Sequence, residues 1–525
     1  MKRRDFLKNT IPAATLLSSV NGYSVQGFLG NSLLQSRLLE PSFDTDNVLV
    51  IVQLNGGNDG LNMVIPVSDY SNYYKARPNV AIAENKILKL NGFNNTGLHP
   101  AMTGMQTLFN ENKLAVVQSV GYPSPNFSHF RATDIWMSGS DANVNVNSGW
   151  AGRYLDNEYS NYPNGYPNTS MPDPLAVQIG SVTSLTCQGP VVNMGMSITD
   201  PTSFYNLVSG IEDAVPNNYM GHELAYVRLI AKQTNKYTLR IQEAAAAVTQ
   251  QSAYPANNSL ADQLKIVARL VKGGLKTRIY MVSYGGFDTH ASQTLPGDTA
   301  TGTHANLLKN VSSAIKAFMD DVQFLGIDQR VMGMTYSEFG RRIKSNASGG
   351  TDHGAAAPLF LFGKKVNNVV LGTNPTIPAT ATTNDNIPYQ YDFRSVYASV
   401  LEKWFCVPQN DLQTILLKNF QSLDVVNNSV CSVKPPESRA DNLISNYPNP
   451  FTQTTTIKFT TKGGHTLIQV IDSSGRMLKT VLEKDYPVAG TYTVFFESYS
   501  LPPGVYYARL QNGPVQQVKA MLKVR

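Results

Sequence analysis

Residues 284–290 (Tyr-Gly-Gly-Phe-Asp-Thr-His) place the carboxylate of Asp288 two positions before the imidazole of His290. The preceding run, 277–283, is apolar and rich in β-branched and aromatic side chains, which predicts a buried strand. Open α/β folds bind ligands at the carboxyl ends of such strands, so this pair could bind a metal ion or take part in catalysis. The alternative is a turn whose His only caps the following helix.

Three other segments repeat this chemistry. Asp59 follows the apolar run 47–54, Glu338 follows the run 331–337, and a glycine-rich loop leads to Asp352 and His353. Turn residues alone would not be expected to repeat ligand groups at one edge of a sheet. The pattern predicts divalent metal ions (zinc, calcium or magnesium). The predicted metal ligands are Asp59, Asp288, His290, Glu338, Asp352 and His353.

Ser128 and His129 are the predicted catalytic residues. Ser128 stands where a helix should begin, between the strand expected at 113–119 and the apolar residues 132–137. Helix N-termini favour anionic groups, so a serine there could attack a phosphate or sulfate ester. Arg131 is a further candidate for a supporting role. The alternative for Ser128 is a plain N-cap.

These side chains need a sheet to bring them together. Apolar runs alternate with helical patterns through the chain, the clearest being an amphipathic helix at 304–324. We therefore predict an α/β domain at 47–425 with a mainly parallel sheet and helices on both faces. Further strands are expected at 330–339 and 358–363, and further helices within 219–275 and 393–405.

From about residue 426 the composition changes. A linker rich in Asn, Ser and Pro is expected at 426–443. Beyond it, short strands separated by turns predict a small all-β sandwich at 444–525.

The N-terminus has the form of a signal. Residues 2–8 are basic and 11–17 are apolar but too short to span a bilayer. The Arg-Arg-Asp-Phe-Leu-Lys sequence resembles the twin-arginine export motif, so residues 1–30 are predicted to be a cleaved signal peptide. No later segment is apolar for long enough to cross a membrane, which predicts a secreted or cell-surface protein exported through the periplasm.

Composition excludes other classes. The net charge of +6 is modest for 525 residues, and no basic cluster suggests nucleic acid. The cysteines at positions 187, 406 and 431 allow neither a disulfide framework nor a CxxC zinc site. Unpaired thiols are expected; the alternative is one pair that bridges after export.

The ordered motifs at 54–62, 98–101, 128–130, 149–153, 285–290, 337–341 and 351–354 closely resemble the twin-arginine-exported domain-of-unknown-function 1501 family. That family is usually placed beside the alkaline phosphatase and sulfatase superfamily. The resemblance spans about 47–425 and implies an alkaline-phosphatase-like core. It also implies that Asp59, the Asp288 and His290 pair, and His353 match metal-binding positions.

The chain departs from the superfamily pattern at three points. One residue separates Asp288 from His290 where three is usual, Glu338 has no adjacent His, and Ser128 lacks a Cys/Ser-x-Pro-x-Arg context. The departures disfavour a formylglycine sulfatase and leave a catalytically altered relative as an alternative.

The C-terminal unit resembles the type A sorting domain of the type nine secretion system of Bacteroidetes. Tyr-Pro-Asn-Pro-Phe at 447–451 and Pro-Gly-Val-Tyr-Tyr at 503–507 carry the resemblance. It implies passage across the outer membrane, with the twin-arginine and type nine machinery as partners. The alternative is a carbohydrate-binding β-module.

The sequence therefore predicts a secreted metal-dependent hydrolase of phosphate or sulfate esters, acting on small molecules or polysaccharides. The alternative is a non-catalytic surface protein that binds anionic polysaccharide or envelope components through the same cleft.

Overall fold

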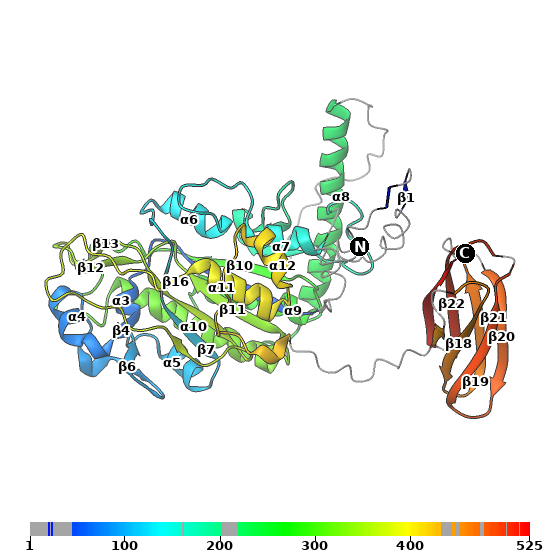
Figure 1. The fold of residues 1–525 in the computed structure, drawn as a ribbon. Helices are drawn as coiled ribbons and strands as arrows, with labels where there is room; N and C mark the ends of the chain where they lie inside the picture. Colours follow the sequence, from blue (N-terminus) through cyan, green and yellow to red (C-terminus); the bar gives the residue numbers. More distant parts are fainter. Residues whose placement is uncertain are drawn as a thin grey trace. The chain divides into compact units, whose positions relative to one another are not determined.

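The structure is a computed structural model that describes residues 19–20, 23–24, 45–159, 162–201, 219–431, 444–447, 451–472, 477–499, 501–513 and 515–524. The chain divides into two compact units, and the main part of the second begins at Ser432, directly after Cys431 (Figure 1). The predicted signal peptide lies outside the described residues, apart from the short antiparallel pair β1 (Ser19–Val20) and β2 (Tyr23–Ser24). Most of the predicted linker, 432–443, also lies outside them.

A nine-stranded sheet forms the centre of the first unit, and its strand order is β15-β7-β14-β11-β3-β10-β8-β9, with β16 beside β7. Its strands are β3 (Val48–Leu54), β7 (Leu114–Gly121), β8 (Ala176–Ile179), β9 (Gly195–Ile198), β10 (Ile279–Tyr284), β11 (Val331–Tyr336), β14 (Ala357–Gly363), β15 (Val370–Leu371) and β16 (Tyr391–Asp392). Only β14 runs antiparallel to its neighbours. The predicted mainly parallel sheet is confirmed.

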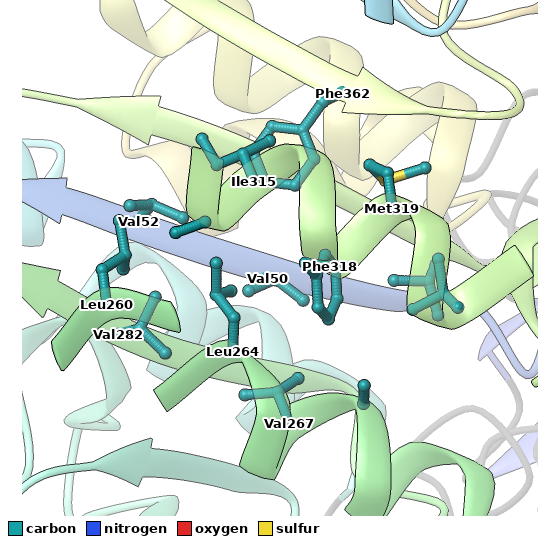
Figure 2. Packing of buried hydrophobic residues seen from close by; sticks show 14 of the residues in the cluster. Val50, Val52, Leu260, Leu264, Val267, Val282, Ile315, Phe318, Met319 and Phe362 are labelled. Carbon is teal, nitrogen blue, oxygen red and sulfur yellow. The ribbon is translucent and has the colours of Figure 1, made fainter. Parts of the chain in front are cut away.

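Strand β3 is buried on both faces because every residue from Val48 to Leu54 is apolar except Gln53. Val50 and Val52 point to one core cluster, where Leu264 of α9 (Ser259–Lys272) and Phe318 of α10 (Thr303–Phe324) cover the sheet (Figure 2). Alternation along a strand sends the intervening residues to the opposite face. This packing holds the strand at the middle of the domain.

The opposite face carries a second core cluster, which contains Leu49 and Ile51 of β3. Helices α7 (Trp150–Glu158), α11 (Phe393–Ser399) and α12 (Gln409–Leu416) pack on it, and α11 continues into a π-helix at Val400–Trp404. Helices on both faces of the sheet are thus confirmed (Figure 1).

Smaller elements surround this sandwich. Strands β4 (Val64–Pro66), β5 (Leu88–Leu90) and β6 (Phe93–Leu98) form a separate sheet, and β12 (Arg341–Ser345) pairs with β13 (Thr351–His353). The remaining α-helices are α3 (Gly60–Met63), α4 (Tyr70–Ala76), α5 (Thr103–Asn110), α6 (His129–Ser138) and α8 (Tyr219–Ala246). The 3-10 helices are Val67–Asp69, Glu84–Lys86, Leu185–Cys187, Asp328–Arg330 and Asn428–Val430.

A disulfide joins Cys406 to Cys431 near the end of the first unit. The expectation that all three cysteines are unpaired thiols was therefore wrong for this pair, because the fold brings two residues 25 positions apart to a Cα separation of 5.4 Å. Cys187 is free and buried, as expected. A bridge of this kind persists in the oxidising surroundings of exported proteins.

The second unit is a small all-β sandwich, as predicted. One sheet contains β17 (Ile444–Tyr447), β18 (Thr454–Thr461) and β21 (Gly490–Glu497), and the other contains β19 (Gly464–Ile471), β20 (Met477–Tyr486), β22 (Gly504–Asn512) and β23 (Val515–Lys523). Both sheets contribute to one core, for example through Phe459 and Val470. The sequence reading missed β17 and β20.

No helix in the described part of the chain is both long enough and apolar enough to span a membrane.

Candidate metal centre

Three adjacent parallel strands deliver most of the candidate site. In the order β11, β3, β10, their carboxyl ends continue into Glu338, the glycines Gly56 and Gly57, and Asp288. Parallel strands end at the same edge of a sheet, so the loops meet there. His129 arrives as the first residue of α6, and His353 as the last residue of β13.

The glycines allow a close approach of the loops. Gly56 has a φ of +120°, and a Cβ on it would lie 2.5 Å from the backbone nitrogen of Asp288. Gly57 has a φ of +71°, and a Cβ there would lie 2.2 Å from the ring of Phe339. Any side chain at either position would push the Asp288 and Glu338 loops apart.

Asp288 lies at the centre of the site and is half exposed. Its Oδ1 atom accepts a hydrogen bond from the Arg341 guanidinium at 2.7 Å and lies 2.7 Å from His290 Nδ1. His353 Nε2 lies 3.2 Å from Oδ1, and His129 Nε2 lies 3.5 Å from Oδ2. Ligand atoms of His129, Asp288 and His353 all lie within 4.8 Å of one another, which is a possible metal site.

Arg341 holds the loops around Asp288. Its side chain is fully buried and donates to the backbone carbonyls of Gly57, Thr351 and Phe287, as well as to Asp288. Partial burial raises the pKa of Asp288, but the hydrogen bonds from Arg341 and His353 outweigh it and lower the pKa to about 2. Asp288 is therefore ionised at neutral pH.

Both histidines of the possible metal site are anchored through Nδ1. His129 Nδ1 lies 2.8 Å from Glu338 Oε1, which also accepts from the Gly56 N–H. His353 Nδ1 lies 2.8 Å from the carbonyl oxygen of Phe127. Burial lowers the pKa of His353, even though its hydrogen bonds to Phe127 and Asp288 raise it. The two Nε2 atoms are left facing Asp288.

The structure does not bring every predicted site residue into this cluster. Asp59 is fully buried and forms a bidentate ion pair with Arg77, with both N–O distances at 2.8 Å. Burial is the largest single influence on the pKa of Asp59 and raises it, but Arg77, His304 and Gln293 together lower the pKa by more, so the net shift is downward. Asp352 accepts from Asn346 Nδ2 at 2.9 Å, because neighbouring residues of a strand point to opposite faces. Among the described residues, neither carboxylate has a hydrogen bond or ion pair to His129, His290 or His353.

Ser128 lies at the N-cap of α6, but its side chain does not cap the helix. The residue is exposed, and its N–H donates to Asn126 Oδ1 at 2.9 Å. It stands between Phe127 and His129, the two residues tied to the cluster. Arg131 donates to three backbone carbonyls of the following loop, those of Asp141, Ala142 and Val144.

Sequence reasoning assigned no role to Arg341 or to Arg77. Arg341 was part of the motif at 337–341, so an arginine directly after the Phe-Gly pair at 339–340 could have been predicted to hold neighbouring loops together. Arg77 lies 18 positions from Asp59 and follows no strand, so no local pattern connects the two.

Two protein families match parts of this chain. Residues 212–401 match the model described as "Protein of unknown function (DUF1501)". The predicted resemblance to this family is confirmed over residues 212–401, within the predicted span of 47–425. The DUF1501 match includes Asp288, Glu338 and His353, and ends before the disulfide. Residues 445–523 match the "Secretion system C-terminal sorting domain", which indicates secretion or export to the cell surface. Neither match reaches the predicted twin-arginine signal.

No curated protein matches this chain. Similar solved structures include one from Bacteroides thetaiotaomicron, whose description concerns glycosaminoglycan metabolism, at 10% identity over 84% of this chain and 90% of that one, with a TM-score of 0.32. A protein in the alkaline phosphatase superfamily from Vibrio parahaemolyticus shows 8% identity over 84% of each chain and a TM-score of 0.34. The PsFucS1 sulfatase from Pseudoalteromonas shows 11% identity over 86% of this chain and 83% of that one, with a TM-score of 0.29. At these scores the similarities carry no statement about the chemistry of this chain.

Proposed function

We propose that this protein is a secreted, divalent-metal-dependent hydrolase of phosphate or sulfate esters. The observation that supports it is the convergence of His129, Asp288 and His353, whose ligand atoms lie within 4.8 Å of one another at the sheet edge. Three protein ligands with at least one open position are typical of catalytic rather than structural metal sites. The partial exposure of all three side chains leaves that position accessible.

The donor set fits a divalent cation. Asp288 is ionised, and each histidine directs an Nε2 atom towards it while Nδ1 is anchored elsewhere. His129, Asp288 and His353 would hold the ion, with Glu338 and Arg341 behind them. A bound divalent ion would supply Lewis-acid stabilisation of a developing oxyanion and lower the pKa of a nearby hydroxyl or water.

Charge favours an anionic substrate. Without metal the site contains two carboxylates, Asp288 and Glu338, against the single guanidinium of Arg341. A divalent cation reverses the sign of that balance, so the loaded site would attract phosphate or sulfate. The N-terminus of α6 at Ser128 adds backbone N–H groups that favour an anion.

Ser128 is the proposed nucleophile. Its hydroxyl is not used in capping and the residue is exposed, so Oγ is free to approach an ester bound beside His129. Attack of Oγ on phosphorus or sulfur would displace the alcohol, and water would then release the anion from Ser128. His129, the next residue, would hold the metal ion beside the Ser128 hydroxyl.

The alternative is a non-catalytic protein that binds anionic polysaccharide through the same cluster. This alternative is favoured because a nucleophilic serine needs a general base that accepts its proton. No side chain in the described part of the chain accepts a hydrogen bond from Ser128 Oγ. The proposed partners of either function are sulfated or phosphorylated glycans, in addition to the secretion machinery implied by the sorting domain.

The test is to measure metal content and the turnover of aryl phosphates and aryl sulfates on the purified full chain. We expect bound divalent metal, turnover of at least one ester class, and loss of both in Asp288→Asn. A folded protein without metal and without turnover would contradict the proposal. Glycan-array binding that survives both chelation and Asp288→Asn would support the binding protein instead.

A further inference from the structure

We propose that this site selects a zinc-class transition metal ion through Nε2 of His129, Nε2 of His353 and one oxygen of Asp288, and that Glu338 is a positioning residue behind His129. The inference rests on the proposed metal dependence and specifies which ions the site takes. It also changes the role of Glu338, which the sequence placed among the ligands.

The tautomer of His353 follows from its partners. A backbone carbonyl can only accept a hydrogen bond, so the 2.8 Å contact with Phe127 requires a proton on Nδ1. When both ring nitrogens carry protons, Nε2 donates to Oδ1 of Asp288 at 3.2 Å. In the neutral imidazole with the proton on Nδ1, Nε2 instead directs a lone pair at that negatively charged oxygen. Two acceptors at this distance repel each other unless a cation or proton lies with them.

His129 repeats the arrangement from another element. Glu338 Oε1 accepts the Gly56 N–H at 2.8 Å, which marks that oxygen as an acceptor. Nδ1 of His129, also 2.8 Å from it, must therefore be the donor. Its Nε2 lone pair faces Asp288 Oδ2 at 3.5 Å. Two histidines thus direct lone pairs to one carboxylate, and a shared metal ion satisfies all three groups.

The ligand chemistry indicates the class of metal. Calcium takes six to eight oxygen ligands and magnesium prefers carboxylates and water, whereas imidazole suits zinc and neighbouring transition metals. Here two nitrogens accompany a single carboxylate, whose Oδ1 already accepts from Arg341 and lies 2.7 Å from His290 Nδ1. The described cluster offers too few protein oxygens for a calcium site.

Glu338 acts on the metal through His129. Its side chain is 2% exposed and is held by the Gly56 N–H, so it stays behind the imidazole. A carboxylate that accepts from a ligating histidine fixes the tautomer and ring orientation and makes the nitrogen a better donor. Loss of such a partner typically lowers metal affinity by about 10- to 100-fold.

The experiment strips the full chain with a chelator and measures binding of Zn²⁺, Ca²⁺ and Mg²⁺ by calorimetry, with the visible spectrum of the Co²⁺-loaded protein as a report on the ligands. We expect Zn²⁺ to bind at least about 100-fold more tightly than Ca²⁺ or Mg²⁺. His353→Ala should abolish the Co²⁺ spectrum. Glu338→Gln should weaken Zn²⁺ by about 10- to 100-fold and keep the spectrum, because the ligands are unchanged.

Glu84→Gln, an exposed carboxylate on a 3-10 helix, is the matched control and should change neither quantity. Glu338→Ala with a thermal melt separates loss of folding from loss of affinity. A spectrum that changes its band pattern in Glu338→Gln would make Glu338 a ligand and overturn its positioning role. Tighter binding of Ca²⁺ or Mg²⁺ would overturn the metal class while leaving the hydrolase standing. Zinc binding without turnover would support the metal class and contradict the hydrolase function. A protein that binds no metal would contradict both the metal class and the hydrolase function.

Discussion

Gln293 Nε2 donates to Asp59 Oδ2 at 2.6 Å, and this bond connects a buried ion pair to the loops that carry the candidate site. The Oε1 atom of the same glutamine accepts from the hydroxyls of Thr289 and Thr351, which are the neighbours of Asp288 and Asp352. Asp59 thus helps to hold the loops of the site in place through its hydrogen bond with Gln293, and Arg77 neutralises its charge.

Asp59→Asn is the first prediction. It leaves the Arg77 guanidinium buried without its carboxylate, so we expect the free energy of unfolding to fall by about 3 to 5 kcal/mol. The folded variant should still bind metal. Urea unfolding and metal analysis at low temperature measure the two effects. Asp288→Asn is the control with the opposite pattern, since its carboxylate is half exposed and Arg341 keeps its hydrogen bonds to backbone carbonyls when the charge is removed. A stable but metal-free Asp59→Asn protein would restore Asp59 as a ligand.

Gly56→Ala should disturb the site through the backbone. The φ of +120° and the 2.5 Å approach to the Asp288 nitrogen leave no room for a methyl group. We expect a loss of about 2 to 4 kcal/mol in stability and weaker metal binding, because the Asp288 loop must move. Gly285→Ala is the control, since a Cβ there meets nothing within 4 Å and the backbone is not left-handed. Equal effects at the two glycines would contradict the close approach.

Ser128→Ala tests the nucleophile. Because the residue is exposed and its side chain makes no capping hydrogen bond, the change should alter the free energy of unfolding by less than about 0.5 kcal/mol. Metal content should be unchanged. Turnover of the aryl esters should fall by at least about 1,000-fold if Oγ attacks the substrate. A variant with wild-type kcat would remove Ser128 from the reaction and favour attack by water.

The pH dependence of stability should report a buried histidine. His304 is fully buried, its Nε2 lies 2.9 Å from Asn58 Oδ1, and burial lowers its pKa to about 4. The unfolded chain titrates near 6.5, so between pH 6.5 and about 4 it binds a proton that the folded state does not. Stability is therefore fully present above 6.5 and falls by about 3 kcal/mol as the pH decreases through this window.

Urea midpoints measured from pH 7 to pH 5 give the slope. His304→Gln should flatten it without abolishing it, because burial also lowers the pKa of His99, to about 3. Replacement of the exposed His465 should leave the slope unchanged. Identical slopes in wild type and His304→Gln would contradict the assignment.

Reduction of the Cys406–Cys431 bridge should destabilise the first unit. The bond closes a loop across a sequence separation of 25, for which chain entropy predicts a stabilisation of about 3 kcal/mol. Dithiothreitol should lower the thermal midpoint of the wild-type protein to that of Cys431→Ser and should not affect the variant. A wild-type midpoint that is insensitive to reductant would indicate that the bridge contributes little.

Much of the architecture was predictable because it depends on local patterns. The mostly apolar runs at 47–54 and 113–119 specify strands buried on both faces, and the stripe at 304–324 specifies a helix that covers them. The alternation of strands with helices then requires a mainly parallel sheet, so the meeting of strand-end loops at one edge followed from the sequence. The antiparallel direction of β14 did not, because a hydrophobic run carries no information on its direction.

Only the tertiary structure decided which strand-end groups face one another. Asp59 and Asp288 both follow a strand and two nearby glycines. Asp59 is nevertheless buried in an ion pair with the distant Arg77, whereas Asp288 pairs with Arg341 and stays half exposed. Asp352 and His353 are neighbours that the pleat sends to opposite sides. The hydrogen bonds that fix the tautomers of His129 and His353 come from residues 209 and 226 positions away. Sequence specified the available chemical groups, and the long-range contacts that orient them could be read only from the folded chain.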